Sequence, residues 1–184
     1  GGVLKYAGAG ECSTKFIKQT GYAGDVWNAG TGDLFFAGLQ GNWNDYKITL
    51  TNDGVHAVGL TGDVLKARPI VAPGSLVRFA PPEGEETAAI DVTNMMVSAN
   101  STLAIADGTS VRIHALYKNS GDSTSVNVLL DEESGAHLVI DNLGGYQSHV
   151  CNRPACRKIE FALSPDEKRI AFAAYLSATC GTVG

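Results

Sequence analysis

The chain has 184 residues, of which 44% are hydrophobic and 18% are charged, and its formal net charge is −5. This hydrophobic fraction is typical of a folded domain and excludes general disorder. The acidic balance argues against a nucleic-acid partner and against electrostatic attachment to anionic lipid. No apolar run reaches the roughly 18 residues that a membrane span needs. We therefore expect one domain over residues 1–184, with no nucleic-acid partner and no membrane insertion.

The N-terminal 21 residues predict a strand followed by a short helix. Residues 1–10, GGVLKYAGAG, are apolar and nearly uncharged, with Val3, Leu4 and Tyr6 as strand formers and no adjacent hairpin partner. An open sheet edge in a neighbouring subunit would satisfy the backbone of such a strand. We predict that it is an exchanged or donated assembly strand, and pairing within its own domain is the alternative. Residues 10–21, bounded by glycine at both ends, predict the helix.

Residues 21–47 hold both tryptophans and six of the fourteen aromatic residues, set among glycine, asparagine and aspartate. Aromatic rings can stack on the apolar face of a sugar, and neighbouring amides and carboxylates can bind its hydroxyls. This composition predicts a glycan-binding or interface site, and its candidate residues are Trp27, Trp43, Asn44, Asp45 and Tyr46. The alternative is that the rings pack at one end of the fold or between subunits.

The rest of the chain is punctuated by short segments rich in β-branched and aromatic residues, separated by turn-forming clusters. The predicted strands are 46–50, 111–117, 125–130, 136–140 and 158–163. Regular short strands of this kind are typical of β-sandwiches and barrels. We find no internal repeat. The expected fold is all-β, a two-sheet antiparallel β-sandwich of jelly-roll type with one short N-terminal helix.

The C-terminal segment 164–181 has two interpretations. Ser164, Pro165 and Glu167 resemble the start of a capped helix, and a glycine ends the segment. The same region also fits a β-hairpin, with two apolar strands around an Asp-containing turn. We favour this hairpin.

Four cysteines predict two disulfides and an oxidising compartment. Cys151 and Cys156 enclose a short turn-like insert, which leaves Cys12 to pair with Cys180. Four free thiols, or a zinc site that includes His149, are the alternatives. We expect a secreted protein with disulfides and with no metal and no cofactor.

One arrangement resembles an active site. His56, Asp91 and Ser123 follow the chain order of chymotrypsin-like proteases, and the residues around Asp91 and Ser123 are similar to that family. The family motif continues with two glycines after the serine, whereas this chain continues with Thr124 and Ser125. We therefore expect no enzymatic activity and no catalytic residues.

Residues 26–58 resemble the start of the TasA and camelysin group of secreted fibre proteins. The matching positions are Gly30, Gly32, Asp33 and Leu34, followed by the segment Ile48 to Gly54. This resemblance implies a jelly-roll subunit that builds filaments by donating a strand to its neighbour.

These observations predict a non-enzymatic extracellular structural or adhesion protein that assembles with copies of itself into a surface layer or filament. The first alternative is a lectin-like module that binds cell-surface glycans through exposed tryptophan and tyrosine. A viral coat or spike jelly roll is the second alternative.

Overall fold

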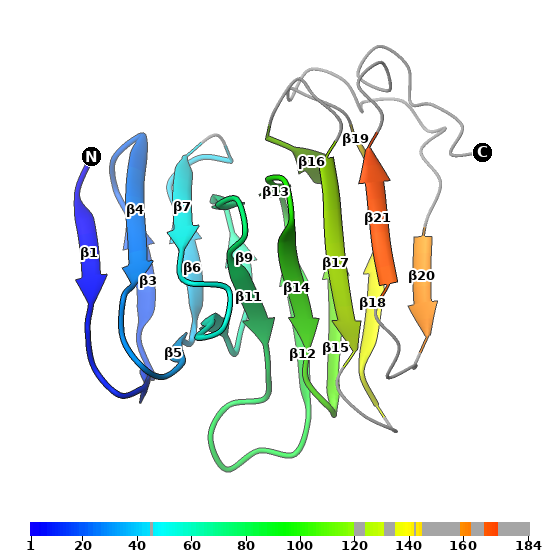
Figure 1. Cartoon of the computed structure of the whole chain (residues 1–184), viewed down its shortest axis with the longest axis horizontal. Coiled ribbons are helices and arrows are strands. Elements are labelled where there is room, and N and C mark those ends of the chain that lie inside the picture. Colours follow the sequence, from blue (N-terminus) through cyan, green and yellow to red (C-terminus); the bar gives the residue numbers. More distant parts are fainter. Residues whose placement is uncertain are drawn as a thin grey trace.

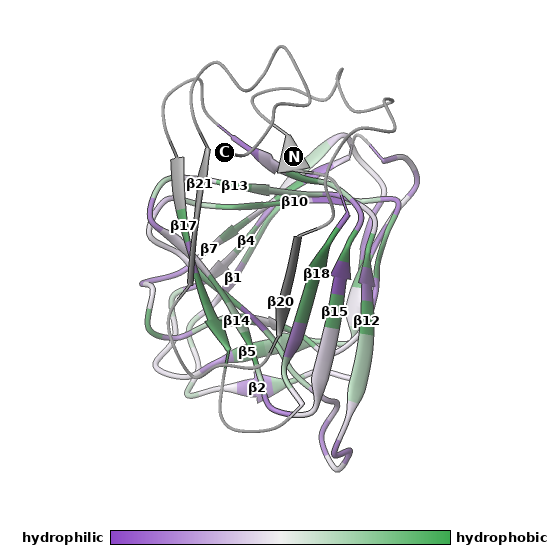
Figure 2. Cartoon of the chain, turned by 90° about the vertical axis from the view of Figure 1, so that its right-hand side faces the viewer, coloured by the Kyte–Doolittle hydropathy of each residue, from purple (hydrophilic) through white to green (hydrophobic). Residues whose placement is uncertain are grey.

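The computed structural model describes residues 1–44, 46–119, 124–130, 135–141, 143–144, 159–162 and 168–172. In these residues the chain is a β-solenoid, in which each turn contributes one strand to each of three walls (Figure 1). Viewed along its axis, the solenoid has three sheets around a central core (Figure 2). The prediction of an all-β chain is confirmed for the described residues, but the antiparallel two-sheet sandwich and its jelly-roll topology are wrong.

Each wall is a seven-stranded sheet. Sheet A consists of β1 (Val3–Tyr6), β4 (Ala23–Asn28), β7 (Lys47–Thr51), β10 (Arg68–Val71), β13 (Met95–Val97), β16 (Leu116–Lys118) and β19 (Leu143–Gly144). Sheet B consists of β2 (Glu11–Cys12), β5 (Leu34–Phe36), β8 (Val58–Leu60), β11 (Leu76–Phe79), β14 (Ser101–Ile105), β17 (Thr124–Leu130) and β21 (Lys168–Phe172). Sheet C consists of β3 (Phe16–Gln19), β6 (Gly38–Gly41), β9 (Val64–Leu65), β12 (Ala88–Val92), β15 (Thr109–Ile113), β18 (His137–Ile140) and β20 (Ile159–Ala162). We call β1, β2 and β3 the first coil.

Neighbouring strands pair in parallel, except that β20 and β21 run antiparallel to β18 and β17. Parallel paired residues lie between 19 positions apart, as for Val58 and Val77, and 28 positions apart, as for Val64 and Val92. A parallel pair needs a long return connection, and here the other two walls supply it. The structure therefore contains the internal repeat that the sequence analysis missed.

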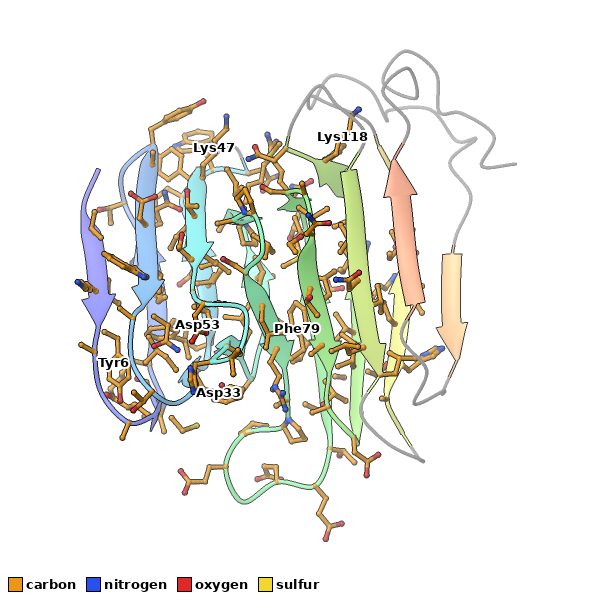
Figure 3. All side chains as sticks on the ribbon, viewed as in Figure 1. Tyr6, Asp33, Lys47, Asp53, Phe79 and Lys118 are labelled. Carbon is orange, nitrogen blue, oxygen red and sulfur yellow. The ribbon has the colours of Figure 1, made fainter. Side chains whose placement is uncertain are left out.

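The core is built from inward-facing apolar residues that stack from coil to coil. In sheet A, Val26, Leu50, Val71 and Val97 occupy successive paired positions and are at most 1% exposed. Sheet B continues the core with a second stack that includes Phe79, which lies inside the solenoid in Figure 3. Because residues alternate between the two faces of a strand, each coil gives one side to this core and the other to solvent.

Two asparagines, the buried Asn28 and the half-buried Asn52, fix the corner between sheets A and B. Asn28 is 1% exposed, donates through Nδ2 to the carbonyls of Gly32, His56 and Ala57 at 2.9–3.2 Å, and accepts the Gly30 N–H at Oδ1. Asn52, in the equivalent position of the next coil, bonds both the N–H and the C=O of Leu76. The Asn-x-Gly pattern that resembled a fibre-protein strand end is thus a solenoid corner. The jelly roll that this resemblance implied is wrong.

Several local predictions also change. Residues 10–21 are not helical, because they contain β2 and β3 joined by a corner. The predicted strands at 46–50, 125–130 and 136–140 exist, and the described part of 158–163 is the strand β20. A bend at residue 114 divides 111–117 between β15 and β16. In the C-terminal segment, residues 168–172 form the strand β21. This strand pairs with β17 and does not form the predicted hairpin with β20. Residues 163–167 and 173–181 lie outside the described residues.

Candidate interface and binding sites

The first coil presents an unpaired sheet edge. In the described part of the chain, β1, β2 and β3 each have a hydrogen-bonded neighbour on one side only. Asp25 and Ala29 donate their N–H groups to the carbonyls of Gly2 and Tyr6, so the even-numbered residues of β1 turn their backbone groups toward β4. The groups of the alternate residues, Val3 and Lys5, therefore face outward. This edge is a template for another strand.

The opposite end is arranged differently. The outer edge of β17 is covered by antiparallel β21, and that of β18 by antiparallel β20 (Figure 1). Reversed strands thus occupy the end positions of sheets B and C. The predicted assembly residues Val3, Leu4 and Tyr6 lie in β1, which pairs with β4 of its own chain.

Exposed apolar side chains gather around the first coil. Val3 is 63% exposed, Leu4 49% and Phe16 54%, although large hydrophobic residues are usually buried. Tyr22 and Trp27, at the start and on the outer face of the second coil, are also exposed. Apolar surface and unpaired backbone therefore occur at the same end of the molecule, as they do at association surfaces.

A cavity of about 540 Å³ opens at this end, between β1, β3 and β4. Leu4, Ile17, Val26 and Ile48 supply apolar walls. Gln19 also lines it and is only 8% exposed; its Nε2 donates to the Lys47 carbonyl, but its Oε1 has no hydrogen-bond partner. A buried acceptor without a donor is costly, which favours an occupant that brings an N–H group to this position.

The aromatic residues predicted to form one site lie in two places. Tyr22, Trp43 and Tyr46 occupy the corner between sheets C and A; Trp43 is 68% exposed, and the Tyr22 and Tyr46 rings meet edge to face at 6.4 Å. Trp27 lies elsewhere, on β4. It is four residues after Ala23, the first residue of that strand, and therefore about 13 Å from Ala23 along the strand. There Lys5 Nζ lies 4.1 Å from its ring centre.

We call Tyr22, Trp43 and Tyr46 the aromatic corner. Asn44 beside it is exposed, and Asp45 lies outside the described residues. The exposure of Trp43 argues against the alternative in which both tryptophans plug the fold.

A network of charged residues, which the sequence analysis missed, lies on the outer face of sheet C. His114 contacts Asp91 Oδ1 through Nε2 and Asp141 Oδ2 through Nδ1, both at 2.8 Å. Arg112 donates from Nε to the same Asp141 oxygen at 2.8 Å, and Asp91 donates its backbone N–H to Asp63 Oδ1 at 2.8 Å. The Arg112 hydrogen bond lowers the pKa of Asp141, with a smaller contribution from His114, and Asp141 raises the pKa of Arg112.

Beside this network lies a shallow groove of about 290 Å³ on the same face. It is lined by Asp63, Ala89, Ile90, Asp91, Ser110 and Arg112. Across the groove, Asp91 pairs in register with Arg112 and Ala89 with Ser110. Strand spacing thus places these groups about 4.8 Å apart.

The protease-like arrangement is not assembled in the described residues. His56 Nδ1 bonds Asp53 at 2.7 Å, whereas Asp91 bonds His114, and Ser123 lies outside the described residues. The backbone N–H groups of His56 and Val55, followed by the His56 ring, lower the pKa of Asp53 to about 2. Within the described ranges, no three His, Cys, Asp or Glu side chains converge as a metal site. No described helix is long and apolar enough to cross a membrane.

Of the four predicted disulfide cysteines, the structure describes one. Cys12 is exposed on β2 and forms no disulfide with a described residue. Cys151, Cys156 and Cys180, like His149, lie outside the described residues. Among the described strands, β21 is the nearest to Cys180 in sequence. Six strand spacings, about 29 Å, separate β21 from β2, which carries Cys12.

No protein-family model, curated protein or solved structure matches this chain. The comparisons therefore assign it neither a family nor an activity.

Proposed function

We propose that the chain is a non-enzymatic structural and adhesion subunit of an extracellular surface, and that it associates with a second copy of itself through the first coil. The observation that carries this proposal is the coincidence, at one end of the solenoid, of unpaired strand edges and exposed Val3, Leu4 and Phe16. A second copy would satisfy the edge backbone and cover the apolar side chains in one step. The cavity with the unpartnered Gln19 Oε1 would close in the same contact.

The topology favours a head-to-head arrangement. Every coil winds in the same sense, so two first coils that face each other present strands that run in opposite directions. Antiparallel pairing follows, and β20 and β21 already show that strands of this solenoid accept antiparallel neighbours. Head-to-tail stacking would instead use the outer edges of β19, β20 and β21, and two of these strands, β20 and β21, run against the direction of the coils. A head-to-head contact is two-fold symmetric and closes as a dimer, which could act as the unit of a larger layer.

In this arrangement β1 stays in its own sheet and pairs through its open edge with the second copy, whereas strand donation would move β1 into the sheet of the neighbour. Because β1 pairs with β4, deleting residues 1–10 would uncover a new edge on β4, so point variants are the better test. Val3→Lys places a charge on the open edge, and Val3→Pro removes an N–H that faces away from β4. Val55→Lys is a matched control, because Val55 is 68% exposed at a distant corner and Val3 is 63% exposed.

The test is the native mass by light scattering over a range of concentrations. We expect a mass of two 19.2 kDa chains for the unchanged protein and for Val55→Lys, and a mass of one chain for both Val3 variants. Circular dichroism should show that all four proteins are folded. A single-chain mass for the unchanged protein at every concentration would refute the proposal.

Glycan recognition is the second candidate, and the exposure of Trp43 and Tyr22 is the observation that favours it. The aromatic corner offers ring faces to a sugar without rearrangement. A glycan array with Trp43→Ala tests this function, and Trp27→Ala is the matched control on the outer face of sheet A. Equal binding by both variants would argue against the aromatic corner. The viral jelly-roll alternative loses its structural basis, because the fold is a parallel solenoid.

A further inference from the structure

The polar groups around the sheet C groove are held in place before any ligand arrives. Asp63 is tied through Oδ1 to the Asp91 backbone, Asp91 through Oδ1 to His114, and Arg112 through Nε to Asp141. Each contact engages only one oxygen of the Asp63 or Asp91 carboxylate, or only Nε of the Arg112 guanidinium. The second oxygens of Asp63 and Asp91 and the two terminal NH₂ groups of Arg112 have no partner in the described part of the chain. A site whose side chains are already fixed loses little conformational entropy on binding.

The free groups form an alternating set of acceptors and donors on a flat parallel sheet. The carboxylate oxygens accept hydrogen bonds, the guanidinium donates them, and the exposed Ser110 hydroxyl can do both. The exposed Ala89 gives the groove an apolar component between these groups, whereas the Ile90 side chain is buried in the core. A ligand that fits must offer donors and acceptors a few ångströms apart on a largely rigid frame. Vicinal hydroxyls on a sugar ring have this property.

Charge narrows the class of ligand. Arg112 is the only cation that lines the groove, and Asp141 already pairs with it, whereas Asp63 and Asp91 add two further carboxylates. An anionic ligand would meet these two carboxylates, which disfavours acidic polymers. The groove is shallow, and neighbouring strands repeat their groups about every 4.8 Å. This geometry suits an extended chain better than a small enclosed molecule.

We infer that the groove on sheet C, formed by Asp63, Asp91, Ser110 and Arg112, binds a neutral oligosaccharide lying across the strands. The carboxylates accept hydrogen bonds from the sugar hydroxyls, and Arg112 donates to the hydroxyl or ring oxygens. This site is separate from the first coil, so it stands whether or not two copies associate. It also differs from the aromatic corner, which lies nearer the N-terminal end.

The test is titration with four tetrasaccharides, followed by amide chemical shifts and calorimetry. Cellotetraose, chitotetraose and maltotetraose are the neutral probes, and tetragalacturonate is the anionic probe. Asp63→Asn keeps the oxygen that holds the Asp91 N–H but removes the charge. Arg112→Lys keeps the charge but removes the fork of donors. Asp25→Asn is the control, because it removes an exposed carboxylate from sheet A.

We expect at least one neutral probe to bind at millimolar concentration or below, to shift the amides of Ala89, Ser110 and Arg112, and to lose at least tenfold in affinity in both groove variants. Asp25→Asn and Trp43→Ala should bind like the unchanged protein. Three results would each overturn the inference: no neutral probe binds, tetragalacturonate binds more tightly than they do, or Trp43→Ala abolishes binding that Asp63→Asn leaves intact.

Discussion

Replacing Asn28 should destabilise the solenoid more than any surface change of similar size. Asn28 is buried at the corner between sheets A and B and makes four hydrogen bonds, of which two reach His56 and Ala57 in the next coil. Asn28→Ala takes a donor from the Gly32, His56 and Ala57 carbonyls, of which Ala57 keeps the Leu34 N–H, and leaves the Gly30 N–H without its acceptor. At roughly 1 kcal/mol per net bond, with shared donors counted once, we expect a loss of about 2–4 kcal/mol in unfolding free energy.

Asn28→Asp is the more specific test, because it keeps the shape of the side chain and replaces the donor Nδ2 by an acceptor oxygen. Its side chain would turn acceptor oxygens toward three carbonyl oxygens, so repulsion adds to the lost bonds and the loss should exceed that of Asn28→Ala. The matched control is Asn44→Asp, the same change at an exposed position. Urea unfolding followed by circular dichroism measures both. If Asn28→Asp lies within about 0.5 kcal/mol of the control, the corner does not depend on this asparagine and the reasoning fails.

Gly59→Ala should destabilise the fold by about 1–3 kcal/mol in urea unfolding, because a Cβ there would lie 2.1 Å from the Phe35 ring, whereas Gly21→Ala, with nothing within 4 Å, should be nearly neutral. Asp53 has its pKa lowered from 3.8 to about 2, so its contribution to stability is present above pH 4 and is lost as the pH falls toward 2; an NMR titration of its carboxyl should show this low midpoint, and Asp53→Asn should remove this part of the acid dependence. The pKa of Asp141 is also lowered, so Arg112→Gln should move the Asp141 titration to higher pH, and an unchanged midpoint would show that the Arg112 contact is not formed.

Local strand signals could be read from the sequence, but the pairing of the strands could not. Alternation in 125–130 and 136–140 is a property of neighbouring residues, and both segments are strands. Parallel partners lie 19 to 28 residues apart, and this variable spacing hides the repeat from any fixed-period comparison. The inward positions share only apolar character. The predicted helix at 10–21 failed because β2 has two residues, too few to show a period.

The candidate sites, like the strands, could be predicted only where they depend on local sequence and not on strand pairing. Exposed aromatics could be proposed from composition, but the separation of Trp27 from Trp43 depends on the register of β4. Asp91, His114 and Asp141 are separated by 23 and 27 residues, about one coil each, so their contact follows only from the solenoid. Once the repeat is known, this spacing is the signal that would have found the network.

The most direct test of the central claim is the distance between equivalent spin labels in two associated copies. A keto-bearing amino acid at Lys18 or at Ser110 would carry the label and leave the cysteines in place. Lys18 lies in β3 and Ser110 in β15, four strand spacings away. In a head-to-head dimer the distance between labels at 18 should be below about 20 Å, and that at 110 should be about 43 Å. Equal distances at the two positions would indicate head-to-tail stacking and contradict the account, as would the absence of any distance between copies.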